Sequence, residues 1–310
     1  MKERFSNIGT DLSLAFIAVI WALNFTVIKA TLVEFDPYTF NMVRFVLAAL
    51  FMWAVLIRRE GGMTIHKKDW KWLIPISILG NLIYQGLFII GIDLTYAANA
   101  AVLLGTIPIW VALFSHLFGV EKINRLAALG IFFAFAGVLL IIMFGKNPIS
   151  FGSDSFTGDI LITLSAIVWG AFTLLTKPFL GRYTPLQFST FMTTSGAISF
   201  ILVAIPFYPD VDWGGLSTAA WSGAIYSGLL SIGLAYLIWN NGLKKVGVVR
   251  TATYQNLVPV LGLLFGLILL GEALQPLQYL GSAVVIAGIL ITRRGNASRK
   301  ETVTKSGFPR

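Results

Sequence analysis

Cysteine is absent from this 310-residue chain, and histidine occurs only as His66 and His116. The lack of cysteine excludes disulfides, thiolate metal ligands and thiol nucleophiles. Two isolated histidines do not form a metal cluster or a nucleophile–base pair, so the sequence predicts no enzyme, no cofactor and no metal site. His116 stands alone near the end of an apolar run, which is more typical of a packing or interfacial histidine than of a proton carrier.

Charge is also scarce. Only 12% of the residues are charged and 56% are hydrophobic, whereas a soluble domain usually carries about 25% charged residues. A helix that crosses the hydrocarbon core needs about 20 mostly apolar residues. Ten such runs are present, at 12–32, 37–57, 73–92, 97–119, 126–144, 158–177, 186–207, 219–239, 249–270 and 275–292. They predict an all-α polytopic protein of the bacterial plasma membrane, with ten transmembrane helices.

The distribution of charge predicts the topology. With the N-terminus inside, inner segments hold 20 of the 23 Lys and Arg, and the outer loops hold Lys146 alone. Short basic loops stay in the cytoplasm, so both termini are expected there. Met1–Arg4 precedes a long apolar run without a small-residue cleavage site, which favours an uncleaved first span over a signal peptide. The net charge of +9 thus reflects topology and is compatible with affinity for anionic lipid, and it does not indicate nucleic acid.

The chain repeats itself. At an offset of 148 residues the matching pairs are Trp21 and Trp169, Lys29 and Lys177, Pro37 and Pro185, and Phe40 and Phe188. At an offset of 151 they include Pro108 and Pro259, Glu121 and Glu272, Gly130 and Gly281, and Gly137 and Gly288. Each copy holds five predicted spans, an odd number, so the second copy must enter the membrane from the opposite side. We therefore expect inverted five-helix repeats at 12–142 and 158–292, followed by a basic cytoplasmic tail at 293–310.

Three strings carry a resemblance to a known family: WALNFTVIK (21–29), VEKINRLAALGIFFAFAGVLLI (120–141) and LGEALQPLQYLGSAVVIAGILI (270–291). The chain resembles the EamA-type members of the drug/metabolite transporter superfamily over nearly its whole length. It departs from the usual pattern at Ala22 and at Val120, where glycine is common. The resemblance implies a ten-helix carrier whose cavity is lined by helices 1, 3, 4, 6, 8 and 9, with helices 5 and 10 at the periphery. Family members move amino acids, other small metabolites, nucleotide sugars or drugs, many of them outward.

Two basic residues, Lys29 and Arg44, lie within predicted spans, where a charge costs at least about 2.5 kcal/mol. Lys29 and its repeat partner Lys177 either contact an anionic substrate or gate the pathway, or else they anchor the helices at the two interfaces. Arg44 lies deeper and has no acid on its own helix. A structural bridge to a carbonyl or to Glu34 or Asp36 is slightly favoured over substrate binding.

Polar stripes mark the expected pathway. The third span places Ser77, Asn81, Tyr84, Gln85 and Phe88 on one helical face, and a lipid-facing stripe would not contain amides. Such groups either line a cavity, which we favour, or bond one helix to another. With the matching positions elsewhere, the expected pathway comprises Trp21, Asn24, Lys29, Asn81, Tyr84, Gln85, Trp169, Thr173, Lys177, Tyr236, Trp239, Asn240, Tyr254, Gln255 and Asn256.

These features predict a secondary transporter, an exporter of an amino acid or a related carboxylate-bearing metabolite. The span cores contain aromatic and basic groups, which favour such a substrate over a dication. No Asp or Glu lies in the core of any predicted span, so a carboxylate proton relay is not supported. A non-transporting scaffold or receptor subunit is the alternative, and a membrane-embedded enzyme is a weaker one. Glu121 and Glu272 fall at helix ends, where a loop-capping role is expected. The expected partners are a small molecule and the lipid bilayer, for a monomer or homodimer that binds no nucleic acid.

Overall fold

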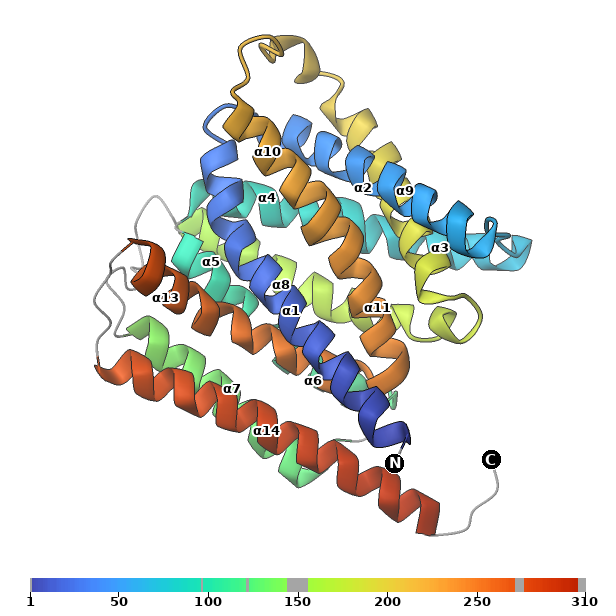
Figure 1. The fold of residues 1–310 in the computed structure, drawn as a ribbon, viewed down its shortest axis with the longest axis vertical. Helices are drawn as coiled ribbons and strands as arrows, with labels where there is room; N and C mark the ends of the chain where they lie inside the picture. The colour runs from blue at the N-terminus through green and yellow to red at the C-terminus, as the bar shows by residue number, and fades with distance from the viewer. Residues whose placement is uncertain (1, 96, 121–122, 144–155, 271–275, 306–310) are drawn as a thin grey trace.

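The computed structural model describes residues 2–95, 97–120, 123–143, 156–270 and 276–305, and every regular element in these ranges is a helix (Figure 1). Six of the described helices are long and apolar enough to cross a membrane: Ile8–Thr31, Pro37–Glu60, Lys67–Leu94, Phe156–Gly181, Pro185–Ala204 and Thr218–Val246. They belong to α1 (Lys2–Thr31), α2 (Pro37–Glu60), α3 to α4, α8 (Phe156–Thr176), α9 (Pro185–Ala204) and α10 to α11. These correspond to the first three expected spans of each half.

The third spanning helix of each half contains a π-helical segment in its middle. In the first half, η2 (Ile78–Ile83) joins α3 (Trp70–Ser77) to α4 (Tyr84–Leu94); in the second, η5 (Ser227–Leu234) joins α10 (Thr218–Tyr226) to α11 (Ala235–Val246). The N–H of Tyr84 donates to Leu79, and that of Ala235 to Leu230, each five residues back. Adding 151 to the range 78–83 gives 229–234, which lies within η5. The wider turn redirects the side chains that follow, and such segments are frequent at functional sites.

Two spans expected to be continuous are interrupted. The run 97–119 forms α5 (Ala97–Leu104) and α6 (Ile107–Leu117), and the run 249–270 forms α12 (Val248–Thr253), the 3₁₀ turn η6 (Tyr254–Asn256) and α13 (Leu257–Leu270). Proline has no N–H, and its ring clashes with the carbonyl four residues back. That carbonyl belongs to Leu104 for Pro108 and to Gln255 for Pro259, where the two breaks occur. Each of these two runs therefore forms an interrupted helix.

α2 and α9 begin at equivalent prolines, each after a capping residue. Asp36 accepts hydrogen bonds from the N–H groups of Tyr38 and Thr39. Thr184, 148 residues later, forms a capping box with Gln187. Proline suits the first turn because its missing N–H has no helical partner there in any case. The remaining turns are η1 (Lys67–Asp69), η3 (Phe179–Gly181) and η4 (Tyr208–Asp210).

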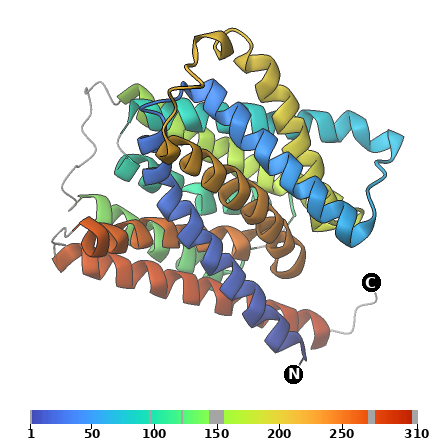
Figure 2. The same ribbon diagram turned by 45° about the horizontal axis from the view of Figure 1, so that its top comes forward.

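α7 (Arg125–Met143) and α14 (Pro276–Lys305) lie side by side along one edge of the bundle (Figures 1 and 2). Glycine allows the close approach. A Cβ at Gly130 would lie 2.7 Å from the carbonyl oxygen of Gly288, and one at Gly137 would lie 2.6 Å from that of Gly281. Asn124 adds a 2.6 Å hydrogen bond to the carbonyl of Gly295. α14 continues beyond the expected end of its span at 292.

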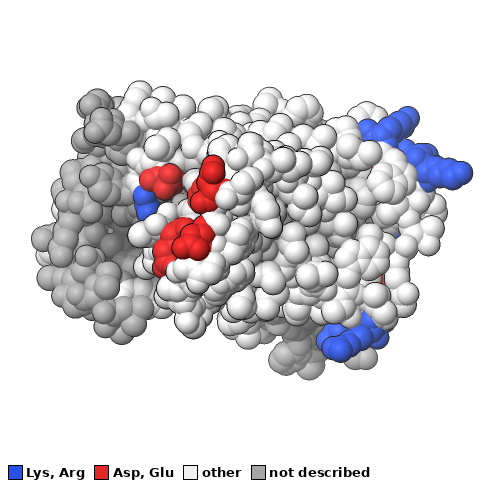
Figure 3. Space-filling view, turned by 90° about the horizontal axis from the view of Figure 1, so that it is seen from above, with Lys and Arg blue, Asp and Glu red and all other residues white. Residues whose placement is uncertain are grey.

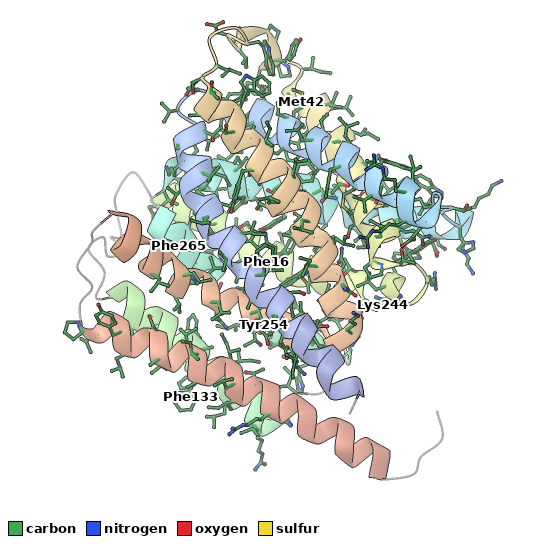
Figure 4. The ribbon with its side chains drawn as sticks, in the orientation of Figure 1. Phe16, Met42, Phe133, Lys244, Tyr254 and Phe265 are labelled. Atoms are coloured by element: carbon green, nitrogen blue, oxygen red, sulfur yellow. The ribbon has the colours of Figure 1, made fainter. Side chains whose placement is uncertain are left out.

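The surface charges gather at two opposite ends of the molecule (Figure 3). We call one the acidic end and the other the basic end; Lys244 marks the basic end at the close of α11 (Figure 4). The acidic end carries Glu34, Asp36, Asp93, Asp210 and Asp212, and the basic end carries Arg58, Arg59, Lys67, Lys68, Lys71, Arg182, Lys244 and Lys245. Between them, large apolar side chains such as Phe16 and Phe133 are 52% and 39% exposed on the outside of the bundle (Figure 4).

The glycine contact between α7 and α14 generates a stability prediction. Gly137→Ala should lower the melting temperature of the purified protein by several degrees, because overpacking typically costs about 1–3 kcal/mol. Gly262→Ala is the matched control, since nothing lies within 4 Å of a Cβ there. Equal melting temperatures for both variants and the wild type, measured by differential scanning fluorimetry, would contradict the contact.

Candidate functional site

A cavity of about 50 Å³ lies between the two halves of the chain. Eight of the expected residues line it: Trp21, Asn24, Arg44, Tyr84, Gln85, Trp169, Tyr236 and Gln255. Phe25, Phe88, Ala101, Leu104, Gly105, Ile107, Ser231 and Val258 complete the lining. Both broken helices thus contribute, through the α5–α6 break and η6. The volume holds only a few water molecules, so its walls must separate before a metabolite enters.

Gln85 and Tyr236 meet in the wall of this cavity. Nε2 of Gln85 donates a 2.8 Å hydrogen bond to the hydroxyl of Tyr236. The two residues occupy equivalent positions, since 85 and 236 differ by the repeat offset of 151. Both are buried, with exposed fractions of 3% and 4%. Each of these residues is the second one after the π-helical segment of its half, so the two segments precede this contact symmetrically.

Aromatic rings form one wall, with Trp169 in the middle. Its ring centroid lies 4.5 Å from that of Tyr84, 5.5 Å from Tyr236 and 5.9 Å from Trp239. Trp239 in turn lies 5.5 Å from Trp21. Trp239 therefore supports the lining from behind, and the Nε1–H of Trp21 is held by the carbonyl of Ser231 at 3.0 Å. Tilted ring pairs at these separations are favourable beyond the area that they bury.

Arg44 is the buried cation of the site, with an exposed fraction of 1%. Its NH1 group donates to Oδ1 of Asn41 at 2.8 Å, and its guanidinium lies 5.2 Å from the ring centroid of Phe40. The two acids considered as partners are engaged elsewhere. Glu34 binds Ser217, and Asp36 caps α2. Arg44 does not bridge to either loop carboxylate.

Several expected residues lie outside the cavity and bond helices together instead. Asn81 donates to the carbonyl of Met192 at 2.9 Å, and Asn240 donates to the hydroxyl of Ser189 at 2.8 Å. Both contacts reach α9. Thr173, Tyr254 and Asn256 are buried without lining the cavity; Tyr254 lies beside α1 in Figure 4. The polar residues expected on one face of the third span therefore have two different roles. Asn81 packs against α9, whereas Tyr84 and Gln85 line the cavity.

The two lysines also lie away from the cavity. Nζ of Lys29 donates to the carbonyl of Asp93 at 2.8 Å, at the acidic end. Lys177 is half-buried at the end of α8, toward the basic end. Their positions near opposite ends agree both with anchoring of the helices at the two membrane interfaces and with a gating role. Glu121, Glu272 and Lys146 fall outside the described residues.

Polar contacts join the two halves of the chain at both ends of the bundle. At the acidic end, the N–H and hydroxyl of Ser217 donate to Glu34 at 2.8 and 2.7 Å. These bonds hold the pKa of Glu34 below its ordinary value, so the contact is intact at neutral pH and is lost as the pH falls through that lowered pKa. At the basic end, Arg182 forms an ion pair with Asp69, and the hydroxyl of Tyr183 donates to Asp69 at 2.7 Å. Burial and this hydrogen bond raise the pKa of Tyr183, which keeps its hydroxyl protonated.

Two buried carboxylates were missing from the expected site. Asp11, near the start of α1, pairs with Arg250 at 2.6 Å, and Asp159, near the start of α8, accepts a 2.6 Å hydrogen bond from the hydroxyl of Thr95. They are only 5% and 6% exposed. Both lie at span ends, and an analysis limited to span cores overlooks them. The offset of 148 between 11 and 159 is the signal that identifies them as a pair.

A larger hollow of about 720 Å³ lies at the basic end between α3, α6 and α8. It is lined mostly by apolar side chains, and Trp72 and Phe118 on its border are 58% and 72% exposed. None of the expected pathway residues lines it. The smaller central cavity is therefore the candidate site.

Comparison with known proteins decides the family. The model of the EamA-like transporter family matches residues 9–143 and again residues 156–294. The chain belongs to the EamA-like transporter family. It is a multi-pass membrane protein of the plasma membrane, as the sequence resemblance predicts.

Relatives of this EamA-like protein are named transporters. It is 29% identical over 274 residues to the uncharacterized transporter YyaM of Bacillus subtilis, covering 88% of this chain and 90% of the relative. It is 28% identical to an uncharacterized transporter of Archaeoglobus fulgidus, covering 92% and 98%. It is 24% identical to a probable terminal-alkyne amino-acid exporter of Streptantibioticus cattleyicolor, covering 95% and 97%. A solved crystal structure at 18% identity superposes with a TM-score of 0.76 and covers 92% of this chain and 98% of its own, which shows the shared fold.

The central hydrogen bond generates a prediction for this EamA-like transporter. Gln85→Leu and Tyr236→Phe should each lower uptake about tenfold or more, because each removes a polar group from the cavity wall. Folding should be preserved, since an interhelical hydrogen bond in a membrane protein contributes about 0.6 kcal/mol on average.

The matched control is Ser195→Ala, which removes a 2.7 Å hydrogen bond to Ser77 outside the cavity. It should transport normally. Unchanged uptake by Gln85→Leu and Tyr236→Phe, at equal amounts of reconstituted protein, would assign the central bond to helix packing alone.

Proposed function

We propose that this chain is a secondary transporter that moves a small carboxylate-bearing metabolite, such as an amino acid or a related compound, by alternating access, and that it works as an exporter. The observation that carries the proposal is a cavity lined by residues of both halves, among them the equivalent pairs Trp21 and Trp169, and Gln85 and Tyr236, with polar contacts between the halves at both ends of the bundle. The named relatives support transport, and one of them is named as a probable amino-acid exporter.

Reciprocal contacts support two inverted repeats of five helices each. An offset of 148 converts Glu34 to Arg182 and Asp69 to Ser217, so the Glu34–Ser217 contact becomes the Arg182–Asp69 contact. A pair of contacts that are exchanged in this way is expected around a two-fold axis. The two copies of this contact lie at opposite ends of the molecule, as an axis in the membrane plane requires.

The outer pair of helices follows the same rule. An offset of 151 relates Gly130 to Gly281 and Gly137 to Gly288, so that the Gly130–Gly288 contact becomes the Gly137–Gly281 contact. The Gln85–Tyr236 hydrogen bond maps onto itself and would lie on the axis. We therefore propose ten membrane spans, of which α5–α6 and α12–α13 are the interrupted fourth and ninth. Interrupted helices at the repeat interface are a recurring feature of transporter sites.

The charge separation supports the orientation. Exposed Lys and Arg gather at the basic end, where Glu60 is also exposed, and the exposed acids Glu34, Asp93, Asp210 and Asp212 gather at the acidic end (Figure 3). By the positive-inside rule we propose that the basic end faces the cytoplasm, and that both termini lie on that side. The Glu34–Ser217 contact then closes the outer side, and the Arg182–Asp69 contact closes the inner side.

Single cysteines test this orientation, since the chain has no cysteine of its own. A cysteine at Asp212 should react with a membrane-impermeant maleimide added to intact cells, whereas cysteines at Lys67 and Lys245 should react only after permeabilisation. The reverse pattern would overturn the topology, and labelling of all three positions from one side would overturn the inversion.

Transport itself is tested with purified protein in liposomes. Vesicles preloaded with unlabelled L-amino acids should accumulate the same labelled amino acids by exchange, and empty vesicles or vesicles with Gln85→Leu should not. A protein that binds amino acids without exchanging them would be a receptor and not a carrier. The absence of both binding and exchange for carboxylate-bearing metabolites would overturn the proposed substrate class.

A further inference from the structure

Arg44 carries a charge that the described residues do not neutralise. Its side chain is 1% exposed, its Nε has no hydrogen-bond partner among the described residues, and its NH1 binds a neutral amide. No carboxylate of the described residues lies within 4 Å of it, by contrast with Arg250, which pairs with Asp11. Burying an unpaired charge in a membrane protein costs several kcal/mol, so such a group is retained for a reason.

The position of Arg44 points to the missing anion. Arg44 lines the central cavity, so an anion in the cavity could reach the guanidinium. The helix that carries it is held in place there: a Cβ at Gly228 on η5 would lie 2.8 Å from the carbonyl oxygen of Arg44. The guanidinium is therefore presented from a closely packed backbone, which favours recognition of a carboxylate.

Other cavity atoms also lack hydrogen-bond partners in the part of the chain that the structure describes, and they include both donors and acceptors. Nε1 of Trp169 is a second unused donor, whereas Oε1 of Gln85 and Oε1 of Gln255 are unused acceptors. The amide nitrogen of Gln85 is occupied by Tyr236, which leaves its oxygen for a ligand. Buried polar groups without partners are rare in folded proteins, and four around one cavity match a ligand with both an anionic and a donor group.

Resting on the proposed carrier function, we propose that Arg44 binds the carboxylate of the substrate and that Gln85 and Gln255 accept hydrogen bonds from its ammonium group. The cavity would then take a zwitterionic amino acid in preference to the corresponding acid or amine. The aromatic wall of Trp21, Tyr84 and Trp169 favours an apolar side chain, and its ring faces also attract an ammonium group.

The first test is the melting temperature of the full-length protein without substrate. Arg44→Gln removes a buried charge that lacks a counter-ion, so it should leave the melting temperature unchanged or raise it. Arg250→Gln breaks an observed ion pair and should lower it by several degrees. A fall for Arg44→Gln as large as that for Arg250→Gln would show that Arg44 is a structural bridge, and it would overturn the proposal whatever the protein transports.

The second test uses three related probes: L-leucine, L-leucinamide, which lacks the carboxylate, and 4-methylpentanoate, which lacks the ammonium group. L-leucine should bind the wild-type protein about tenfold or more tightly than either analogue, which corresponds to about 1.4 kcal/mol or more. Quenching of the intrinsic tryptophan fluorescence reports binding, since Trp21 and Trp169 line the cavity.

Arg44→Gln should abolish the preference for L-leucine over L-leucinamide, and Arg44→Lys should restore part of it. Gln255→Leu should weaken L-leucine but leave 4-methylpentanoate unchanged. A wild-type protein that binds none of the probes, or an Arg44→Gln variant that still discriminates against the amide, would overturn the proposal. If the preference for L-leucine over L-leucinamide depends on Arg44 but no exchange occurs in liposomes, the proposed binding site is supported and the carrier function is overturned.

Discussion

The hydrogen bond between Gln85 and Tyr236 joins the two halves of the chain at the centre of the molecule. Each of the two residues makes further contacts that connect this bond to another part of the site. On one side, Asn41 donates to the carbonyl of Gln85 and in turn receives Arg44, so the cation is positioned through the helix that carries Gln85. On the other side, Tyr236 packs against Trp169, the residue around which the aromatic wall is built. The same hydrogen bond thus connects the buried cation and the aromatic wall.

This arrangement has a consequence for the proposed alternation. The contacts at the two ends are built from a few hydrogen bonds and one ion pair, and they are related by the repeat offset. Interhelical hydrogen bonds in membranes contribute about 0.6 kcal/mol on average, so opening either end would break only weak interactions. Two conformations of similar free energy are what a substrate can shift by binding one better than the other. The contacts Glu34–Ser217 and Arg182–Asp69 are related by the repeat offset. Opening one end while closing the other therefore replaces one contact by its counterpart, which keeps the free energies of the two conformations similar.

Much of this could be predicted from the sequence because apolar periodicity and repetition are local signals. The spacing of Tyr84 and Gln85 placed them on one helical face, and the offset of 151 identified Tyr236 as the partner position. The remainder required tertiary information. Nothing in the chain indicates that Lys29 is satisfied by the carbonyl of Asp93, because a backbone acceptor leaves no residue type to recognise. The π-helical segments were equally hidden, since they depend on a backbone hydrogen bond five residues back and not on a distinctive composition.

The division of labour among the helices follows from the kind of contact that each makes. α7 and α14 meet through glycines at close backbone approach, and this contact involves no polar group of the cavity. Such packing depends on shape and tolerates little displacement. The helices around the cavity meet through hydrogen bonds and aromatic rings, which can exchange partners as the walls move, but α4 and α8 also meet through a close backbone contact between Gly91 and Gly158. If the carrier alternates as proposed, its motion should therefore occur between α1, α11 and the packed α4–α8 pair, while the α7–α14 pair keeps its packing. The small volume of the closed cavity fits this view, because space for a substrate must come from separating α1 and α11 from that pair.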